Sequence, residues 1–295
     1  MKEKNYNIAI IGAGKAGVAI GHLLAKKGHT IIAAVARSGA SLEKADPYLP
    51  GVHLTKNPAE ATAGADIIFI TTRDSEIKPA CDNLVSKGAI FPSQTVIHMC
   101  GAGSLDLLSS AANMGANVAV VHPIQSLASV NLAIEKLPGS YFGVTAEGKA
   151  KEVALSLVRD LEGKAVDIDD KDKSLYHAAA CIASNYLVTL LYAATLAYKA
   201  SGMDETSALN AMLSLVKTTV SNIEDVGAVA ALTGPISRGD ASIVKQHLKS
   251  LKSLDGGIID IYKSLGRLTI EIALKKGTLG QENAAEIATL LNDGG

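Results

Sequence analysis

Hydrophobic and polar positions in the first half of the chain alternate in a way that predicts a layered fold. Short apolar runs of the kind that form buried strands recur between residues 7 and 121 as NIAII, TIIAAV, ADIIFI, TVIH and NVAVV. Each run is followed by a turn and a segment with helical or loop-like spacing, an order typical of a parallel sheet with helices on both faces. Two more runs, SYFGVTA and KAVDID, flank the helical KAKEVALSLVRDLEG and extend the predicted sheet.

Helical spacing takes over in the second half. From Lys171 onward the pattern is broken at SGMD, LTGPISRGD, LDGG and KKGTLG, and no strand pattern follows Asp172. We therefore predict an α/β protein in which a Rossmann-type doubly wound parallel sheet, residues 1–170, is followed by an all-α domain, residues 171–295. A helical domain in this place often forms a dimer, and we expect a homodimer through it.

One apolar stretch in the helical half, AAACIASNYLVTLLYAATLAY, is long enough to span a bilayer. Ser184, Asn185 and three tyrosines interrupt it, so we interpret it as a helix buried inside the helical domain. The N-terminus lacks the small-residue cleavage site of a signal peptide. We expect a cytoplasmic protein that does not bind membranes.

Composition and charge narrow the classes of partner. The 295 residues carry 28 basic and 29 acidic side chains, without the basic block that follows a nucleic-acid backbone, so nucleic acid is not an expected partner. The three cysteines, Cys81, Cys100 and Cys181, are odd in number and far apart, which fits neither a disulfide framework nor a CxxC metal site. A reducing compartment suits them.

The strongest motif is the glycine turn IIGAGKAG, which ends a strand pattern and opens an amphipathic helix. In this context GxGxxG predicts a dinucleotide site: Gly12 permits the tight turn, Gly14 lets the backbone approach a pyrophosphate, and Gly17 allows the helix to pack closely on the strand. Ala13, Lys15 and Ala16 of the same turn complete the predicted cofactor-binding segment. The alternative is a glycine-rich turn without a ligand.

The end of the second strand indicates which nicotinamide cofactor binds. An acidic residue there would bind the ribose 2′-hydroxyl of NAD, whereas this chain has Arg37 and Ser38. A guanidinium next to a hydroxyl can pair with a 2′-phosphate, so NADP(H) is the predicted cofactor. An ordinary solvated loop arginine is the alternative interpretation of Arg37.

Ligands of such sheets bind beyond the carboxyl ends of the strands, and several polar residues follow those ends. Thr71 and Thr72 are expected along the nicotinamide ribose, while Asp74 or Ser75 is a candidate helix cap. The small turn from Gly101 to Ser104 either holds a substrate carboxylate or only caps a helix with Ser104. His122 is placed where a substrate carbonyl would meet the nicotinamide, with Gln125 and Ser126 as substrate-binding candidates; a structural role for His122 is the alternative.

The segment KSLYHAAACIASNY carries a second set of candidates. On an ideal helix Lys173, His177 and Ser184 fall within about 40° of one another, and Asn185 lies at the rim of that face. A cation, an imidazole and an amide on one face are costly to bury without partners, so we expect them to face a polar cleft, water or another subunit. The alternative is structural: His177 and Asn185 bond backbone groups, and Lys173 is solvated.

A third candidate lies in LTGPISRGD, where Arg238 is expected in a loop before a helix capped by Asp240. Its guanidinium can clamp a substrate carboxylate, or it can simply pair with Asp240. His247 in the following helix has no assigned role.

The segments GAGKAG, VARS, VHPIQS, YHAAACIASN and LTGPISRGD together resemble Rossmann-like proteins whose C-terminal helical domain is catalogued as of unknown function, the DUF2520 type. These proteins belong to the 6-phosphogluconate dehydrogenase-like group, and some resemble the alternative type of ketopantoate reductase. The resemblance implies NADPH-dependent reduction of a 2-keto acid. In related hydroxyacid dehydrogenases a KxxxN pair serves the substrate carbonyl; here Lys173 matches the lysine and His177 replaces the asparagine. VHPIQS is also similar to the HP segment of prephenate dehydrogenases.

The sequence therefore predicts an oxidoreductase in which Lys173 or His177 donates a proton to the reacting oxygen. Asn185 and His122 complete the predicted catalytic group, and the substrate is expected to bind Gln125, Ser126, Ser104 and Arg238. Two alternatives stay open: a prephenate- or pyrroline-carboxylate-type dehydrogenase acting on another small acid, and an NADP(H)-sensing protein without catalytic activity.

Overall fold

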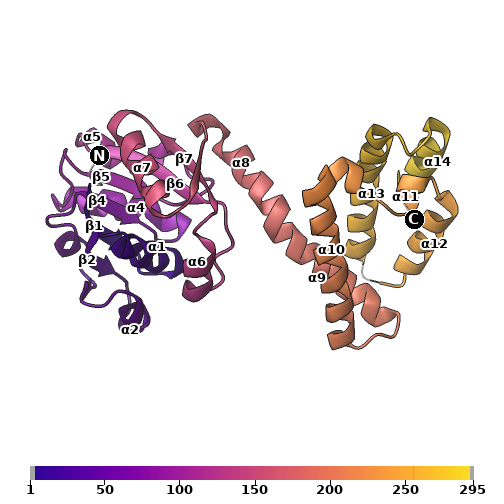
Figure 1. The fold of residues 1–295 in the computed structure, drawn as a ribbon, viewed down its shortest axis with the longest axis horizontal. Helices are drawn as coiled ribbons and strands as arrows, with labels where there is room; N and C mark the ends of the chain where they lie inside the picture. Colours follow the sequence, from indigo (N-terminus) through magenta and orange to yellow (C-terminus); the bar gives the residue numbers. More distant parts are fainter. Residues whose placement is uncertain (1–3, 255, 293–295) are drawn as a thin grey trace. The chain divides into compact units, whose positions relative to one another are not determined.

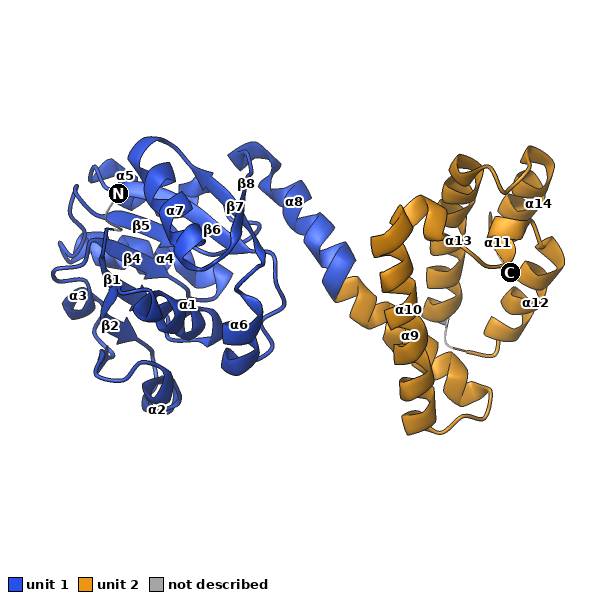
Figure 2. Cartoon of the chain, in the orientation of Figure 1, with its two compact units in different colours: residues 1–184 blue, residues 185–295 orange. Residues whose placement is uncertain are grey.

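The computed structural model describes residues 4–254 and 256–292, and it divides into two compact units, residues 1–184 and 185–295 (Figure 2). The first unit holds an eight-stranded sheet of order β3-β2-β1-β4-β5-β6-β7-β8 (Figure 1). Its strands are β1 (Asn7–Ile11), β2 (Thr30–Val35), β3 (His53–Thr55), β4 (Ile67–Ile70), β5 (Thr95–His98), β6 (Asn117–Pro123), β7 (Tyr141–Ala146) and β8 (Lys164–Asp167).

Helices cover both faces of this sheet, as the alternating pattern predicts. In β1, Ile8 and Ile10 belong to one apolar cluster, while Ala9 and Ile11 belong to another on the opposite face. The helical segments of the unit are α1 (Lys15–Lys26), α2 (Gly39–Ala45), η1 (Asp46–Tyr48), α3 (Pro58–Ala61), α4 (Asp74–Ser86), η2 (Leu105–Leu108), α5 (Ser109–Asn113), α6 (Val130–Lys136), α7 (Gly148–Asp160) and η3 (Asp170–Asp172).

The chain order across the sheet locates the ligand crevice. From β1 the chain moves outward to β2 and β3, then returns to the other side of β1 as β4. Ligands of doubly wound sheets bind beyond the carboxyl ends of the two strands at which the order reverses. Here these are β1, which ends before the glycine turn, and β4, which ends before Thr71.

One continuous helical stretch links the two units. It consists of α8 (Lys173–Ala180), the π-helical turn η4 (Cys181–Asn185) and α9 (Tyr186–Ala200). The second unit continues with α10 (Glu205–Ala231), α11 (Pro235–Arg238), α12 (Ala241–Leu251), α13 (Gly256–Lys276) and α14 (Gln281–Asn292), around a small core of its own that includes Val244, Ala273 and Ile287. No strand occurs after Asp172 among the described residues.

The structure departs from the predicted architecture in the sheet and at the boundary between the units. β7 runs antiparallel to β6, with His122 opposite Gly143, so the sheet is not wholly parallel. The three-residue strand β3 is too short to leave an apolar run in the sequence. The first compact unit extends to Ser184 rather than to residue 170 because the first turns of α8 pack on the Rossmann unit.

The apolar helical stretch is also more exposed than predicted. By length and composition, one helical segment, Asp170–Ala200, could cross a membrane, but only 6% of its most apolar window is buried. Exposed side chains include Ile182, Tyr186, Val188 and Tyr192. The prediction of a helix buried within the chain is therefore wrong.

Candidate functional site

A cleft of about 730 Å³ opens where the sheet order reverses. Its lining includes seven of the predicted cofactor residues: Gly12, Ala13, Gly14, Arg37, Ser38, Thr71 and Thr72. Lys15, Ala16 and Gly17 do not line the cleft; they form the first turn of α1 behind it. The glycine turn and the end of β2 thus meet at one opening, as predicted.

The three glycines have distinct surroundings. Gly12 has a φ of +116°, and a Cβ there would lie 2.8 Å from the backbone of Thr71 and Thr72. A Cβ on Gly14 would meet nothing within 4 Å, so this position faces open space. A Cβ on Gly17 would collide with Ile10 and with the Gly12 carbonyl oxygen.

The cleft offers unpaired polar groups that fit a dinucleotide. Gly14 occupies the N-cap of α1 without any side-chain cap, so the first-turn N–H groups of this helix are available to an anion. The Thr72 Oγ1 atom is buried and has no hydrogen-bond partner within the described residues. Thr71, in contrast, donates its hydroxyl to the Gly12 carbonyl at 2.7 Å and fixes the turn.

Arg37 and Ser38 lie at the end of the cleft that the sequence assigns to a 2′-phosphate. The Arg37 side chain is 77% exposed, and its Nη1 lies 3.9 Å from a carboxylate oxygen of Glu76. Ser38 caps α2 by accepting the backbone N–H of Ser41. Arg73 also lines the cleft and was missed by the sequence analysis, although it directly follows Thr71 and Thr72.

Arg73 also changes the interpretation of the neighbouring helix start. It occupies the N-cap of α4, and Asp74 is the first helical residue, so neither Asp74 nor Ser75 is the cap. Asp74 is instead an acidic residue in the first turn of α4, where a carboxylate interacts favourably with the helix dipole.

A cluster of polar side chains lies at the carboxyl ends of β5 and β6, in the same unit as the cleft. His122 at the end of β6 packs edge-to-face against Tyr176 and His177 of α8, with ring centroids 5.6 and 6.0 Å away. A Cβ on Gly101 would lie 2.5 Å from His177 Nδ1 and 2.8 Å from His122 Nε2. Only glycine at position 101 therefore lets both rings approach the end of β5.

Lys173 is the most constrained residue of this cluster. Its side chain is among the largest fully buried ones, and the residue is 2% exposed, so the alternative of a solvated lysine is wrong. Within the described residues its ammonium makes no hydrogen bond or ion pair. Burial lowers the pKa of Lys173, although Cys100 and Asp170 act in the opposite direction.

Two histidines of the cluster are held neutral. Burial, together with the nearby His177 and Lys173, lowers the pKa of His122 to about 4. Burial likewise lowers the pKa of His98, at the end of β5, to about 4. His98 Nδ1 accepts the Cys100 N–H at 3.2 Å, which makes Nε2 the donor to the Ser104 carbonyl. Sequence analysis missed His98, whose only signal was its place at a strand end.

Hydrogen bonds to His98 and Cys100, which precede the turn, and a bond from Leu105 to the distant Asp170 fix the turn from residue 101 to 104. Ser104 stands at the N-cap of η2, but its side chain makes no capping bond, so the predicted capping role is wrong. Gly103 donates its N–H to the Cys100 sulfur, and Leu105 donates its N–H to Asp170.

His177 retains unused hydrogen-bonding capacity. Its Nδ1 is buried without a partner within the described residues, and its Nε2 lies 3.7 Å from the Cys181 sulfur. Ser184 and Asn185, in contrast, are exposed and belong to the π-helical turn, which alters the ideal helical phase used to place them on the Lys173 face. Asn185 falls in the second compact unit, so its catalytic role stays a prediction.

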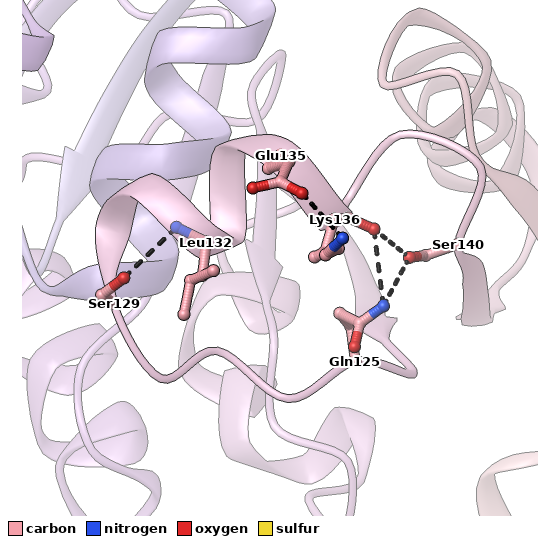
Figure 3. Close-up of polar contacts among 6 residues, drawn as sticks. All are labelled: Gln125, Ser129, Leu132, Glu135, Lys136 and Ser140. Carbon is pink, nitrogen blue, oxygen red and sulfur yellow. Dashed lines mark hydrogen bonds and ion pairs between the residues drawn. The ribbon is translucent and has the colours of Figure 1, made fainter. Parts of the chain in front are cut away.

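Gln125 is used structurally, in contrast to its predicted role in substrate binding (Figure 3). Its Nε2 donates to Ser140 Oγ at 3.1 Å and to the Lys136 carbonyl at 3.4 Å, while its Oε1 accepts the N–H of Ser126. These bonds tie the loop after β6 to the end of α6. Ser126 is exposed.

Arg238 forms the ion pair named as its alternative role. Its Nε lies 3.0 Å from Asp240, and it ends the short helix α11 rather than lying in a loop. Asp240 stands at the N-cap of α12 but makes no capping bond, so its predicted capping role is wrong. Because Arg238 lies in the second unit, substrate binding by it stays a prediction.

The cysteines and acidic residues do not assemble a metal centre in the described part of the chain. Cys81, Cys100 and Cys181 are free thiols, and no group of three or more histidine, cysteine or acidic side chains is arranged to hold a metal ion there.

Family models match both parts of the chain. Residues 1–123 match a Rossmann-like domain, and residues 140–269 match a domain of unknown function, DUF2520. The chain combines a Rossmann-like domain with a DUF2520 domain. No curated protein sequence matches it.

Solved structures share this fold along almost the whole chain. A candidate NADP oxidoreductase from Bacteroides fragilis is 20% identical, with a TM-score of 0.74 over 90% of this chain and 98% of that one. A pyrroline-5-carboxylate reductase from Coxiella burnetii is 17% identical, with a TM-score of 0.59 over 97% and 99%. A reductive aminase from Aspergillus terreus, in complex with NADPH and ethyl levulinate, is 18% identical, with a TM-score of 0.61 over 97% and 99%. At these identities the likeness establishes the fold.

Proposed function

We propose that this protein is an NADPH-dependent oxidoreductase that reduces a small 2-keto acid, with 2-dehydropantoate as the first substrate to test. The observation that carries the proposal is the buried residue Lys173, which makes no hydrogen bond or ion pair within the described residues and acts electrostatically on His122, in the same unit as a dinucleotide cleft. Asp74 links the cleft to the cluster around His122. It lies two residues after Thr72, which lines the cleft, and it interacts electrostatically with His122.

The cleft fits a bound dinucleotide at three points. The open space at Gly14 and the uncapped start of α1 suit a pyrophosphate, the orphaned Thr72 hydroxyl suits a ribose or phosphate oxygen, and Arg37 with Ser38 suits a 2′-phosphate. When bound, NADPH supplies the hydride. The comparison structures support this choice, since one is named for NADP and another contains NADPH.

The chain's own residues supply charge, hydrogen bonds and a proton. A buried ammonium attracts the carboxylate of a 2-keto acid and stabilises negative charge that develops on the reacting oxygen. Its lowered pKa also makes Lys173 a better proton donor than an exposed lysine. His122 is neutral at pH 7, so it serves as a hydrogen-bond donor, and the proton comes from Lys173 or His177.

A second candidate function is reduction of a carbon–nitrogen double bond. The likeness to a pyrroline-5-carboxylate reductase and to a reductive aminase, each over 97% of this chain, favours it. An iminium carbon accepts hydride without a proton donor, so this reaction would depend less on Lys173. A third candidate, a catalytically inactive NADP(H) sensor, would bind the cofactor without turnover.

Oxidation of NADPH, followed at saturating cofactor, tests the proposal. We expect turnover with 2-dehydropantoate or a related 2-keto acid, and a loss of at least about 100-fold in kcat for Lys173→Ala. The control is Lys217→Ala, a lysine on α10 of the second unit. Turnover confined to cyclic imines supports the second candidate. NADPH binding without turnover on either panel supports the sensor, and normal turnover in both Lys173→Ala and His177→Ala would remove the proposed roles.

The preference for NADPH has its own test. Arg37→Ala removes the guanidinium expected at the 2′-phosphate, so NADPH affinity should fall by about 10-fold or more while NADH affinity stays the same. Titration of both cofactors by calorimetry checks this, with Lys44→Ala in α2 as a control. Equal affinities in the wild type, or an unchanged ratio in the variant, would exclude Arg37.

We also propose that two copies associate through the helical unit. Exposed apolar side chains concentrate there. Tyr186, Val188 and Tyr192 of α9 are each more than 60% exposed, and Leu215 of α10 is 60% exposed. The free thiols are consistent with a reducing compartment such as the cytoplasm.

A further inference from the structure

We infer that Tyr176 is a positioning residue that holds His122 in one tautomer, with its N–H on Nε2, and that Gly143 is glycine so that Tyr176 can reach it. The inference rests on the proposed function for its catalytic consequence, but the tautomer itself is a property of the chain alone. Sequence analysis did not single out either Tyr176 or Gly143.

The contact between Tyr176 and His122 is formed over three neighbouring strands of the sheet, β5, β6 and β7. His122 lies in β6, between β5 and β7, and its direct partner in the antiparallel ladder is Gly143. The Tyr176 ring of α8 lies over this pair, and its Oη is 2.7 Å from His122 Nδ1. A Cβ on Gly143 would lie 2.5 Å from that Oη. Any side chain at position 143 would therefore displace the phenol.

The hydrogen-bond partners decide which ring nitrogen carries the proton. Burial raises the pKa of Tyr176 to about 12, so the phenol keeps its proton. Among the described residues the only acceptor recorded for this proton is His122 Nδ1. A buried O–H without an acceptor is costly, so Tyr176 donates and Nδ1 is unprotonated. The neutral ring then carries its hydrogen on Nε2.

The Nε2–H group is the one directed to the site. It lies against Gly101, as does the unpaired Nδ1 of His177, and it makes no hydrogen bond within the described residues. Fixed in this way, His122 offers a neutral donor to a substrate oxygen next to the Lys173 ammonium. Within the described residues, the Tyr176 hydroxyl hydrogen-bonds to His122 Nδ1, so its effect on the reaction passes through His122.

Nuclear magnetic resonance of ring nitrogens in histidine-labelled protein tests the inference without any substrate. Among the signals of the seven histidines, the His122 signal is assigned by its loss in His122→Gln. We expect the wild-type ring to be neutral with hydrogen on Nε2. In Tyr176→Phe the two tautomers should mix, and the titration midpoint of His122 should move up by about one pH unit because the donor to Nδ1 is lost.

The charged and titratable groups that also act on His122 are kept in every variant: His177, Lys173, Asp74 and His98. Tyr262→Phe is the matched control, since Tyr262 Oη lies 2.9 Å from His247 Nδ1 in the second unit and forms the same kind of pair. It should leave the His122 signal unchanged. Gly143→Ala should reproduce Tyr176→Phe.

Hydrogen on Nδ1 in the wild type, or an unchanged His122 signal in Tyr176→Phe, would overturn the inference. The wild-type spectrum alone suffices if either variant fails to fold. A correct tautomer in a protein inactive on every 2-keto acid would reject the proposed function and leave this inference standing. In active protein, Tyr176→Phe should lower kcat more than about 10-fold and leave the KM for NADPH unchanged.

Discussion

His98 lets the pH dependence of stability be predicted at the scale of one residue. It is fully buried, and its pKa in the folded chain is about 4 instead of the ordinary 6.5. The unfolded chain therefore takes up the proton first as the pH falls. The stabilisation from the neutral ring is complete above pH 6.5 and is lost between pH 6.5 and about 4, by up to about 3 kcal/mol.

Urea unfolding between pH 7 and 4 measures this loss. His98→Gln should be less stable at pH 7, because the bonds to Cys100 and Ser104 change, but its stability should fall less steeply with decreasing pH. His53→Gln, at a half-exposed side chain, serves as the control for loss of a histidine. If the His98→Gln curve runs parallel to the wild type, the ring is not held neutral by the fold.

Residues whose role depends on distant partners were the ones that the sequence could not resolve. Gln125 looked available for substrate, yet its amide is occupied by Ser140 and Lys136, which are 15 and 11 residues away. Tyr176 was overlooked because its partner His122 lies 54 residues earlier. Lys173 was expected at a polar site from the sequence itself; it is buried and helps to lower the pKa of His122, and its catalytic role stays a prediction.

At the scale of elements, α1 packs on β1 and on the glycine turn between them. A methyl group added at Gly17 should mainly affect stability, whereas one added at Gly14 should mainly affect cofactor binding. Gly17→Ala should destabilise the first unit by about 1–3 kcal/mol, because the new Cβ would collide with Ile10 and the Gly12 carbonyl. Gly14→Ala should cost less than about 1 kcal/mol, since its Cβ enters open space. Gly14→Ala should nevertheless weaken NADPH binding at least about 10-fold by blocking the pyrophosphate.

Chemical denaturation and cofactor titration of the two variants check this pair of expectations, and each variant is the other's control. Equal stability in both would mean that the helix can shift away from the strand. Normal NADPH affinity in Gly14→Ala would place the cofactor elsewhere.

Element-level prediction succeeded where local pattern determines the outcome. The glycine turn, β1 and α1 follow from a few adjacent residues, so their places could be predicted from the sequence. The antiparallel direction of β7 could not, because an apolar run looks the same in either direction. The π-helical turn was likewise hidden, and it moved Ser184 and Asn185 from the positions that an ideal helix gives them.

At the scale of the whole molecule, the exposed apolar surface of α9 and α10 predicts self-association. Val188 is 69% exposed, and Val188→Asp should weaken the dimer at least about 10-fold, since a carboxylate buried in an apolar contact loses hydration. Phe91→Asp is the matched control, because Phe91 is a half-exposed apolar residue of the first unit and should leave association unchanged.

Light scattering after size-exclusion chromatography, across a range of protein concentrations, distinguishes the outcomes. A wild-type mass twice 30.4 kDa, with a shift to one copy in Val188→Asp, supports the proposed homodimer. A wild-type monomer at all concentrations would reject it. A chain that remains in solution only with detergent would assign the same surface to a membrane instead, because lipid and a second copy would both remove Tyr186, Val188 and Tyr192 from water.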